Sequence, residues 1–358
     1  MERKLRILSM GLVLAMLFAA PIQEGWAQTP MKLKWASPMG APGIAAAGDV
    51  GLYFQQEITR RTNGAITFES FWGGALGSGP VHIELVNTGV AHMIQTYQWA
   101  TPSKMPLGDF EYVFPFGPTD FELVVKAVRK IRSEFPEFSK ELADQNAILL
   151  SDPPQGSYNF LSKTPIRTIK DFEGKKVGLI GRYFGRWLPP GAQAVVRPSS
   201  ERYEMLKSGV ITVDLNPFDN QYQYKFHEMC RYFIENLTVI TCCPMPVIIN
   251  APTFKKFSPE VQKIFLEVGV ETELKAAREI YPQWWQKTLK LWKDGKVENV
   301  KFQEEDKAKW ASTLEDIPAE WAAEVEKIGL PGFKIVQRWQ EITAEMGFKW
   351  NRRWGVKK

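Results

Sequence analysis

The sequence predicts an α/β protein of two lobes, joined by crossing strands and braced by one long helix. Three observations support this fold class. Without its first 27 residues, the 358-residue chain is still longer than a single hydrophobic core usually grows. A helix–glycine–strand unit occurs once in each half, at residues 84–96 and 204–215. A long helix is predicted late in the chain, from Ser258 to about Lys293.

The first 27 residues have the three parts of a secretory signal peptide. Basic residues lie at positions 3, 4 and 6, an apolar run extends from Ile7 to Ala20, and Gly25 and Ala27 provide a cleavage site. The apolar run is shorter than the roughly 20 residues of a permanent membrane helix, and no cysteine follows it to carry a lipid. We therefore expect an exported, periplasmic protein whose mature chain starts at Gln28.

Composition excludes several classes of partner. The 45 basic and 40 acidic residues are interspersed, so no nucleic-acid partner is expected. The three histidines are far apart and no paired metal-binding motif is present, so we expect neither a metal nor a cofactor. Cys230, Cys242 and Cys243 leave at least one unpaired thiol. The many aromatic residues suit large cores, and some could line a pocket for an organic ligand.

The first half begins with alternating strand and helix signals. A strand is expected at residues 31–37, a helix at 45–63 that stops at Asn63-Gly64, and a second strand at 65–71. The glycine-rich loop 73–79 indicates either close approach of the backbone to another group or a tight turn. A helix then starts at Pro80 and ends before Gly89, and a strand follows at 90–96.

The second half repeats the pattern after a proline-rich crossing at residues 152–154. Strands are expected at 175–180 and 210–215, and the extended segment 238–250 crosses back. Ser258 is the expected N-cap of the long helix, with Pro259 at its first position and a kink near Pro282. Further helices rich in tryptophan complete the chain. In such α/β lobes, ligands bind between the lobes at the carboxyl ends of the strands.

Four ordered segments carry a family resemblance. They are residues 162–166 (SKTPI) with 171–177 (DFEGKKV), 201–206 (ERYEML) with Gly209-Val210, and 225–232 (KFHEMCRY). With the Leu76-Gly77 loop and Ser258-Pro259-Glu260, they resemble the DctP-like solute receptors of tripartite ATP-independent periplasmic (TRAP) transporters. The resemblance implies a two-lobed periplasmic binding protein of the Venus flytrap type, which closes on a solute and delivers it to a membrane permease.

The resemblance also suggests a division of the chain. After the signal peptide at 1–27, lobe I comprises 28–152 and about 240–275, and lobe II comprises 153–239 and about 276–345. Residues 346–358 form a C-terminal tail. The expected partners are a small organic solute and the membrane subunits of a TRAP transporter, and the receptor is expected to be monomeric and to perform no chemistry.

The chain departs from the family where the ligand is held. Family members usually carry an arginine on a lobe II strand that grips the ligand carboxylate, and Gly178 stands there. Tyr158 stands at a second, usually basic position, and only Asn216 remains of a polar run in the family. In one interpretation Arg182 or Arg186 replaces the missing arginine. In the other, the ligand is neutral or largely apolar and stacks on aromatic residues.

An unusual or bulky organic acid is the leading ligand class. The alternatives are a binding protein for a neutral or aromatic ligand that serves a sensor, and an exported hydrolase, although no GxSxG motif or Ser–His–Asp arrangement is evident. No catalytic residues are predicted. The predicted ligand contacts are Gln95, Tyr97 and Trp99 from the first lobe, and Gln155, Tyr158, Gly178, Arg182, Asn216 and Phe218 from the second lobe or hinge.

Overall fold

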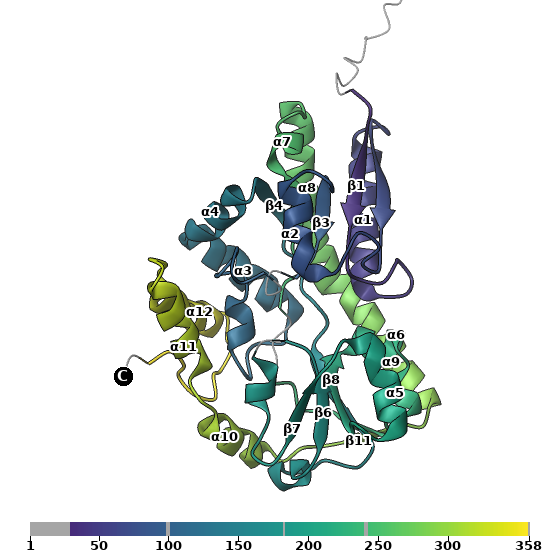
Figure 1. Ribbon diagram of the computed structural model, residues 1–358, viewed down its shortest axis with the longest axis vertical. Helices are drawn as coiled ribbons and strands as arrows, with labels where there is room; N and C mark the ends of the chain where they lie inside the picture. The colour runs from purple at the N-terminus through teal and green to yellow at the C-terminus, as the bar shows by residue number, and fades with distance from the viewer. Residues whose placement is uncertain (1–28, 98–100, 182, 240–242, 357–358) are drawn as a thin grey trace, which may run out of the picture.

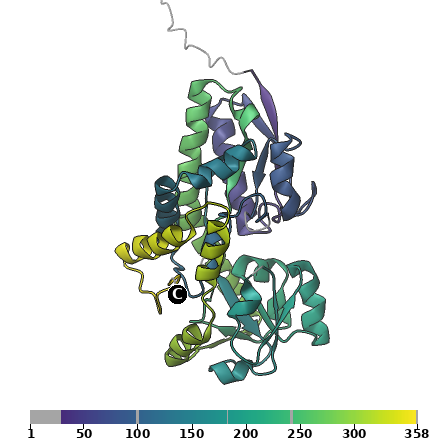
Figure 2. The same cartoon turned by 60° about the vertical axis from the view of Figure 1, so that its left-hand side comes forward.

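Two mixed sheets, each covered by helices, form two lobes one above the other (Figures 1 and 2). The computed structural model describes residues 29–97, 101–181, 183–239 and 243–356. The first sheet has the strand order β2-β1-β3-β10-β4, and the second has the order β11-β9-β5-β8-β6-β7. The predicted two-lobed α/β class is confirmed.

The strands of the first sheet are β1 (Met31–Ala36), β2 (Ile66–Phe71), β3 (Met93–Gln95), β4 (Ala147–Ser151) and β10 (Val247–Asn250). Those of the second are β5 (Tyr158–Ser162), β6 (Lys176–Leu179), β7 (Gln193–Val196), β8 (Val213–Pro217), β9 (Tyr232–Ile234) and β11 (Glu298–Val300). Strands β1, β2 and β3 are parallel to one another, as are β6, β7 and β8.

The helices before the second crossing are α1 (Ala46–Arg61), α2 (Gly79–Asn87), α3 (Phe121–Glu134), α4 (Glu137–Asp144), α5 (Ser199–Ser208) and α6 (Phe218–Gln223). Those after it are α7 (Ala251–Phe254), α8 (Pro259–Lys275), α9 (Tyr281–Asp294), α10 (Glu304–Thr313), α11 (Ile317–Glu326) and α12 (Gly332–Glu345). None of the helices in these described stretches has the length and apolarity to cross a membrane.

The two helix–glycine–strand units have the same local geometry. Gly89 and Gly209 both adopt left-handed backbone angles, with φ of 75° and 80°. In each unit the N–H of the residue two positions after the glycine donates to a carbonyl of the preceding helix. The Ala91 N–H donates to the Leu85 carbonyl (3.0 Å), and the Ile211 N–H donates to the Met205 carbonyl (3.2 Å). This turn delays the strands, so the observed β3 and β8 begin three residues after the predicted starts at 90 and 210.

Two chain segments cross between the lobes side by side. The Met245 N–H donates to the Pro153 carbonyl (2.8 Å), and the Gln155 N–H donates to the Cys243 carbonyl (2.9 Å). Both segments are rich in proline, which removes donors and keeps the pairing short. The predicted crossing strands are therefore present.

The long helix runs from Pro259 to Asp294 and passes from one lobe to the other (Figure 1). The Ser258 hydroxyl accepts the Val261 N–H at 3.3 Å, which confirms the predicted N-cap. A π-helical turn at Ala276–Ile280 separates α8 from α9, just before Pro282, whose missing N–H weakens the α-helical ladder there. In α8, Gly269 allows the close approach of β4, because a Cβ would lie 1.8 Å from the Leu150 carbonyl oxygen.

Candidate functional site

A cavity of about 550 Å³ lies between the two lobes. The carboxyl ends of the parallel strands reach it from both sheets: the loops after β1, β2 and β3 from lobe I, and those after β6, β7 and β8 from lobe II. This is the position at which open α/β sheets bind ligands, and the volume suits a small organic molecule. The cavity is therefore the candidate functional site.

The residues that line it come from loops, strand ends and the crossing segment. They are Pro38, Met39, Gly40, Gly73, Gly74, Ser78, Gly79, Pro80 and Tyr97 from lobe I, and Gln155, Tyr158, Ile180, Pro198, Ser199, Ser200, Asn216, Asn220, Gln223 and Tyr224 from the crossing and lobe II.

The lobe I wall consists largely of backbone and small residues. The chain passes Gly73 and Gly74 with positive φ angles of 64° and 77°, which favour glycine, so the backbone itself forms the surface. The Tyr97 hydroxyl donates to the Met39 sulfur at 3.1 Å, joining the loops after β3 and β1. Burial raises the pKa of Tyr97 well above its usual value, so its hydroxyl stays protonated.

At the crossing, Gln155 and two tyrosines form a polar corner. The Tyr112 hydroxyl donates to the Gln155 side-chain oxygen at 3.1 Å. Tyr158 is buried, packs edge-on against Phe184 with ring centroids 5.2 Å apart, and has its pKa raised by burial. Protonated phenols and an amide can donate or accept hydrogen bonds without adding charge to the cavity.

The lobe II wall presents polar side chains. The Asn216 amide nitrogen donates to the Ser199 hydroxyl at 3.1 Å, and Ser199 in turn accepts a hydrogen bond from Arg202 at 2.7 Å. Arg202 is fully buried behind this wall and pairs with the equally buried Asp214 at 2.7 Å. Burial raises the pKa of Asp214 to about 6, and Arg202 opposes that rise.

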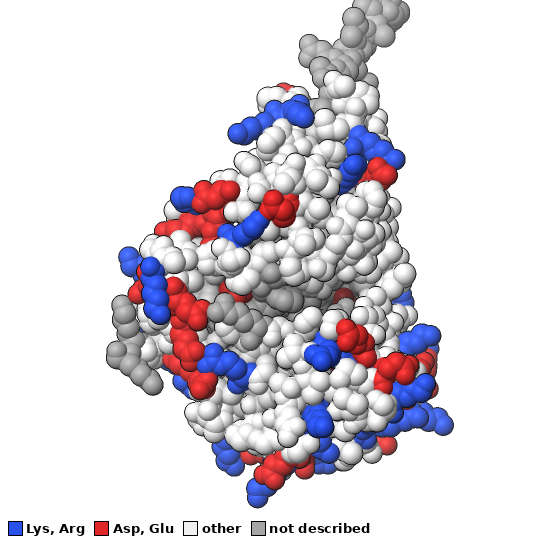
Figure 3. All heavy atoms as spheres, in the orientation of Figure 1, with Lys and Arg blue, Asp and Glu red and all other residues white. Residues whose placement is uncertain are grey.

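No Lys, Arg, His, Asp or Glu is among the lining residues that the structure describes. On the face in Figure 3, the described atoms along the line where the lobes meet are mostly uncharged. The described ranges also contain no cluster of potential metal ligands. The described wall therefore offers a ligand hydrogen bonds and aromatic edges. The buried Arg202 lies behind this wall, where it donates to the lining residue Ser199.

Four of the predicted contacts line the cavity: Tyr97, Gln155, Tyr158 and Asn216. Gln95 and Phe218 are buried outside the lining, where Gln95 donates to the Ala47 carbonyl at 3.0 Å and Phe218 packs edge-on against Trp285. Trp99 and Arg182 lie outside the described residues. Arg186, the alternative to Arg182, instead pairs with Glu315 and Glu320 on the lobe II surface.

Gly178 does not line the cavity, and the space beside it is filled by protein. A Cβ there would lie 2.5 Å from the Ile211 side chain and 2.9 Å from Cδ of Arg202. The interpretation that Gly178 frees volume for a ligand is thus unsupported, because Arg202 and Ile211 occupy that volume. Sequence reasoning missed Ser199 and Arg202. Their three-residue spacing places both on one helix face, but it does not indicate that Arg202 is buried.

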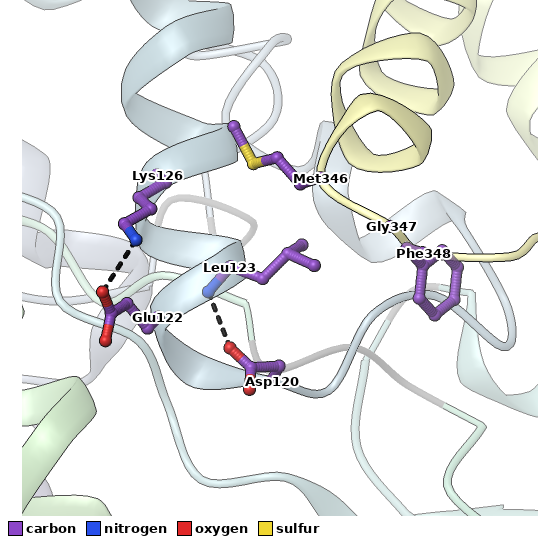
Figure 4. A pocket seen from close by; sticks show the side chains of 7 residues that line it. All are labelled: Asp120, Glu122, Leu123, Lys126, Met346, Gly347 and Phe348. Atoms are coloured by element: carbon purple, nitrogen blue, oxygen red, sulfur yellow. Dashed lines mark hydrogen bonds and ion pairs between the residues drawn. The ribbon is translucent and has the colours of Figure 1, made fainter.

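A second hollow, of about 660 Å³, lies between the start of α3 and residues 346–348 after α12 (Figure 4). Its polar groups already serve the fold. Asp120 caps α3 by accepting the Leu123 N–H at 2.8 Å, and Glu122 pairs with Lys126 and Arg278, both at 2.7 Å. None of its described lining residues belongs to the loops after the parallel strands, so the interlobe cavity remains the better candidate.

The architecture and the cavity agree with a family comparison. The family model for bacterial extracellular solute-binding proteins, family 7 (DctP), matches residues 43–324. The chain belongs to this family. Among curated relatives of this DctP protein, it is 25% identical over 274 residues to the uncharacterized protein YiiZ of Salmonella typhimurium, covering 74% of this chain and 80% of YiiZ. It is 24% identical over 242 residues to a solute-binding protein of a Sulfitobacter species, covering 61% of this chain and 66% of that one.

Solved structures share the DctP fold. A TRAP periplasmic solute-binding protein of Desulfovibrio salexigens superposes with a TM-score of 0.77 at 21% identity, covering 90% of this chain and 98% of that one. A marine metagenome TRAP protein specific for aromatic acids has a TM-score of 0.77 at 20% identity, covering 89% of this chain and 100% of that one. A Sulfitobacter protein with bound β-D-galacturonate has a TM-score of 0.70 at 20% identity, covering 87% of this chain and 100% of that one.

Proposed function

We propose that this DctP-family chain is the extracytoplasmic receptor of a TRAP-type transporter and captures a small organic acid by lobe closure. The observation that carries the proposal is the interlobe cavity at the carboxyl ends of both sheets. Paired crossing segments and a helix shared by both lobes suit a hinged receptor. The bound solute then passes to the membrane subunits, and the receptor itself performs no chemistry.

The acid class is supported by what similar receptors hold. Proteins of this fold have been solved with β-D-galacturonate, D-glucuronate, pyroglutamate and 3-hydroxybenzoate. In this chain the polar groups on the described cavity wall are neutral, so the carboxylate is held by hydrogen bonds from hydroxyl and amide groups. Arg182 stays a proposed additional contact, as do Tyr97, Gln155, Tyr158 and Asn216.

A neutral ligand is the second candidate. The absence of charged side chains from the described lining favours it, because a buried carboxylate without a cation costs desolvation energy. A hydrolase has less support: Ser199 and Ser200 are the hydroxyl nucleophiles of lobe II at the cavity, and no described lining residue is a histidine or carboxylate that could act as their base.

Native mass spectrometry and calorimetry test the proposal. Protein purified from a periplasmic extract should carry a small acid or bind one from a panel of galacturonate, glucuronate, pyroglutamate and 3-hydroxybenzoate. Each acid is paired with a neutral counterpart, such as galactose or 3-hydroxybenzamide. Preference for neutral members would favour the second candidate, and turnover of a bound compound would favour an enzyme. The same sample should begin at Gln28 if the signal peptide is cleaved as expected.

A further inference from the structure

The Ser199 hydroxyl has an unusual set of neighbours. It accepts one hydrogen bond from Nη2 of Arg202 at 2.7 Å and another from the Asn216 amide at 3.1 Å. A hydroxyl has two acceptor positions and one hydrogen to donate. Both acceptor positions are therefore occupied, and the hydroxyl hydrogen has to point elsewhere.

Among the residues that the structure describes, that hydrogen has only a poor partner. The Asn216 side-chain oxygen lies 3.4 Å away, well beyond the usual 2.5–3.0 Å for a hydroxyl donor, and it belongs to the amide that already donates to Ser199. Ser199 is half-buried and lines the cavity. The remaining direction for its hydrogen is therefore the cavity.

The charges behind Ser199 are ordered by distance from the cavity. Nη2 of Arg202 faces Ser199, whereas Nη1 faces Asp214 at 2.7 Å and the Gly178 carbonyl at 2.8 Å. A ligand would meet the serine first, the guanidinium second and the carboxylate third. The positive end of the pair thus lies nearest the ligand and strengthens the serine as a donor.

Gly178 makes this arrangement possible. Arg202 is fully buried, and its Cδ would be only 2.9 Å from a Cβ at position 178. A side chain at position 178 would press on the arginine and on Ile211. The burial of Arg202 in this position therefore depends on the glycine at 178.

We propose that Ser199 donates its hydroxyl hydrogen to the carboxylate of the bound acid, and that Arg202 is the residue that positions and polarises it. This inference rests on the proposed function. It assigns acid selectivity to a serine on α5 that is backed by a buried arginine. Asn216, which also donates to Ser199, holds the hydroxyl from its other side.

The test measures selectivity as well as affinity. Calorimetry compares each acid of the panel with its neutral counterpart in wild type, Ser199→Ala and the control Ser208→Ala at the other end of α5. Ser199→Ala should lower the acid-to-neutral affinity ratio at least tenfold, because it removes a hydrogen bond to a charged group. Ser208→Ala should leave the ratio within about twofold, because that exposed serine does not line the cavity and its hydroxyl donates to the Glu204 carbonyl.

The role of Arg202 needs variants that keep the fold. Arg202→Met combined with Asp214→Leu removes both charges of the buried pair, and its melting temperature without ligand checks folding. This double variant should lose the acid preference as Ser199→Ala does, whereas Arg202→Lys should keep part of it. An unchanged ratio in folded Ser199→Ala overturns the inference and leaves the proposed function intact. Failure of wild type to bind any of the acids overturns the acid assignment and the inference together.

Discussion

The two walls of the cavity are built differently. Lobe I contributes mainly glycines, prolines and backbone, with Tyr97 as its main hydrogen-bonding side chain. Lobe II contributes hydroxyl and amide side chains, with a buried ion pair behind them. We infer that lobe I sets the shape of the closed cavity and lobe II sets its chemical selectivity. Variants in the two walls should therefore have different signatures.

The largest effect is expected from breaking the buried pair of lobe II. Arg202→Met leaves the carboxylate of Asp214 buried without its cation, which should cost about 3–5 kcal/mol in the free energy of unfolding. Adding Asp214→Leu should restore most of this stability, because a pair replaced by apolar residues is often close to neutral. Urea denaturation at pH 7 measures both.

A surface arginine provides the control. Arg197 on the same lobe is exposed and lies 3.8 Å from Glu201. Arg197→Met should change stability by less than about 0.5 kcal/mol. Equal losses at positions 202 and 197 would contradict the buried-pair interpretation.

A smaller loss is expected from filling the space beside β6. Gly178→Ala places a methyl group 2.5 Å from Cδ1 of Ile211, which should cost about 1–3 kcal/mol through overpacking. Ile211→Val removes the clashing methyl group, so the double variant should recover part of the loss. Denaturation curves for the single and double variants give the interaction free energy between positions 178 and 211. Additive losses would show that the two positions do not touch.

The pH dependence of stability should report on Asp219, which accepts a hydrogen bond from the backbone of Ala46 in lobe I. Burial raises the pKa of Asp219 on α6 to about 6, above its ordinary 3.8, although the nearby Ala46 N–H of lobe I opposes the rise. Because the folded state binds the proton more tightly than the unfolded state, stability falls as the pH rises from about 4 to about 6 and then levels off, so acidification from pH 7 to pH 5 should regain about 1–2 kcal/mol from this group.

Asp219→Asn removes that titration and should flatten the stability profile between pH 5 and pH 7. Thermal unfolding at several pH values measures the difference from wild type. Other buried carboxyls, including Asp214 and Asp152, have pKa values raised to about 6 and should leave a residual slope of the same sign. An unchanged slope in Asp219→Asn would exclude this residue as a contributor.

The smallest effect is expected from the lobe I wall. A Cβ at Gly40 would lie 3.1 Å from the side-chain oxygen of Gln223, the far end of a flexible chain across the cavity. Gly40→Val should therefore weaken ligand affinity by about five- to tenfold, near 1 kcal/mol, by obstructing closure. The acid-to-neutral ratio should stay unchanged, and Gln223→Ala should relieve the obstruction. A changed ratio would break the division between shape and selectivity.

Much of the architecture was accessible from the sequence because it depends on local signals. Apolar periodicity, Ser258-Pro259 and the glycines at 89 and 209 specify helices, a cap and turns, and the structure has each of them. The strand-end rule also brought Tyr97 and Asn216 to the cavity. These features need only neighbours in sequence or a general rule of sheet topology.

The Arg202 network could not be predicted in the same way. In the sequence, Arg202 is one charge in a polar helix of ordinary appearance. Its burial depends on the missing side chain of Gly178, 24 residues earlier, and on Asp214, 12 residues later. The departure at Gly178 was recognised, but only packing shows that a side chain from another element takes its place.

The π turn of the long helix has a consequence for how one helix serves two cores. The buried positions Phe265, Val268, Thr272 and Ala276 repeat every three or four residues, the π turn also buries Ala277, and Tyr281, Trp284, Thr288 and Trp292 continue the spacing. Because a π turn closes over five residues, Ala276 and Tyr281 lie on the same side of the helix, and the apolar stripe continues through the turn. Deleting one residue at 276–280 would rotate the tryptophan-bearing half out of the second lobe and uncouple the halves of the molecule.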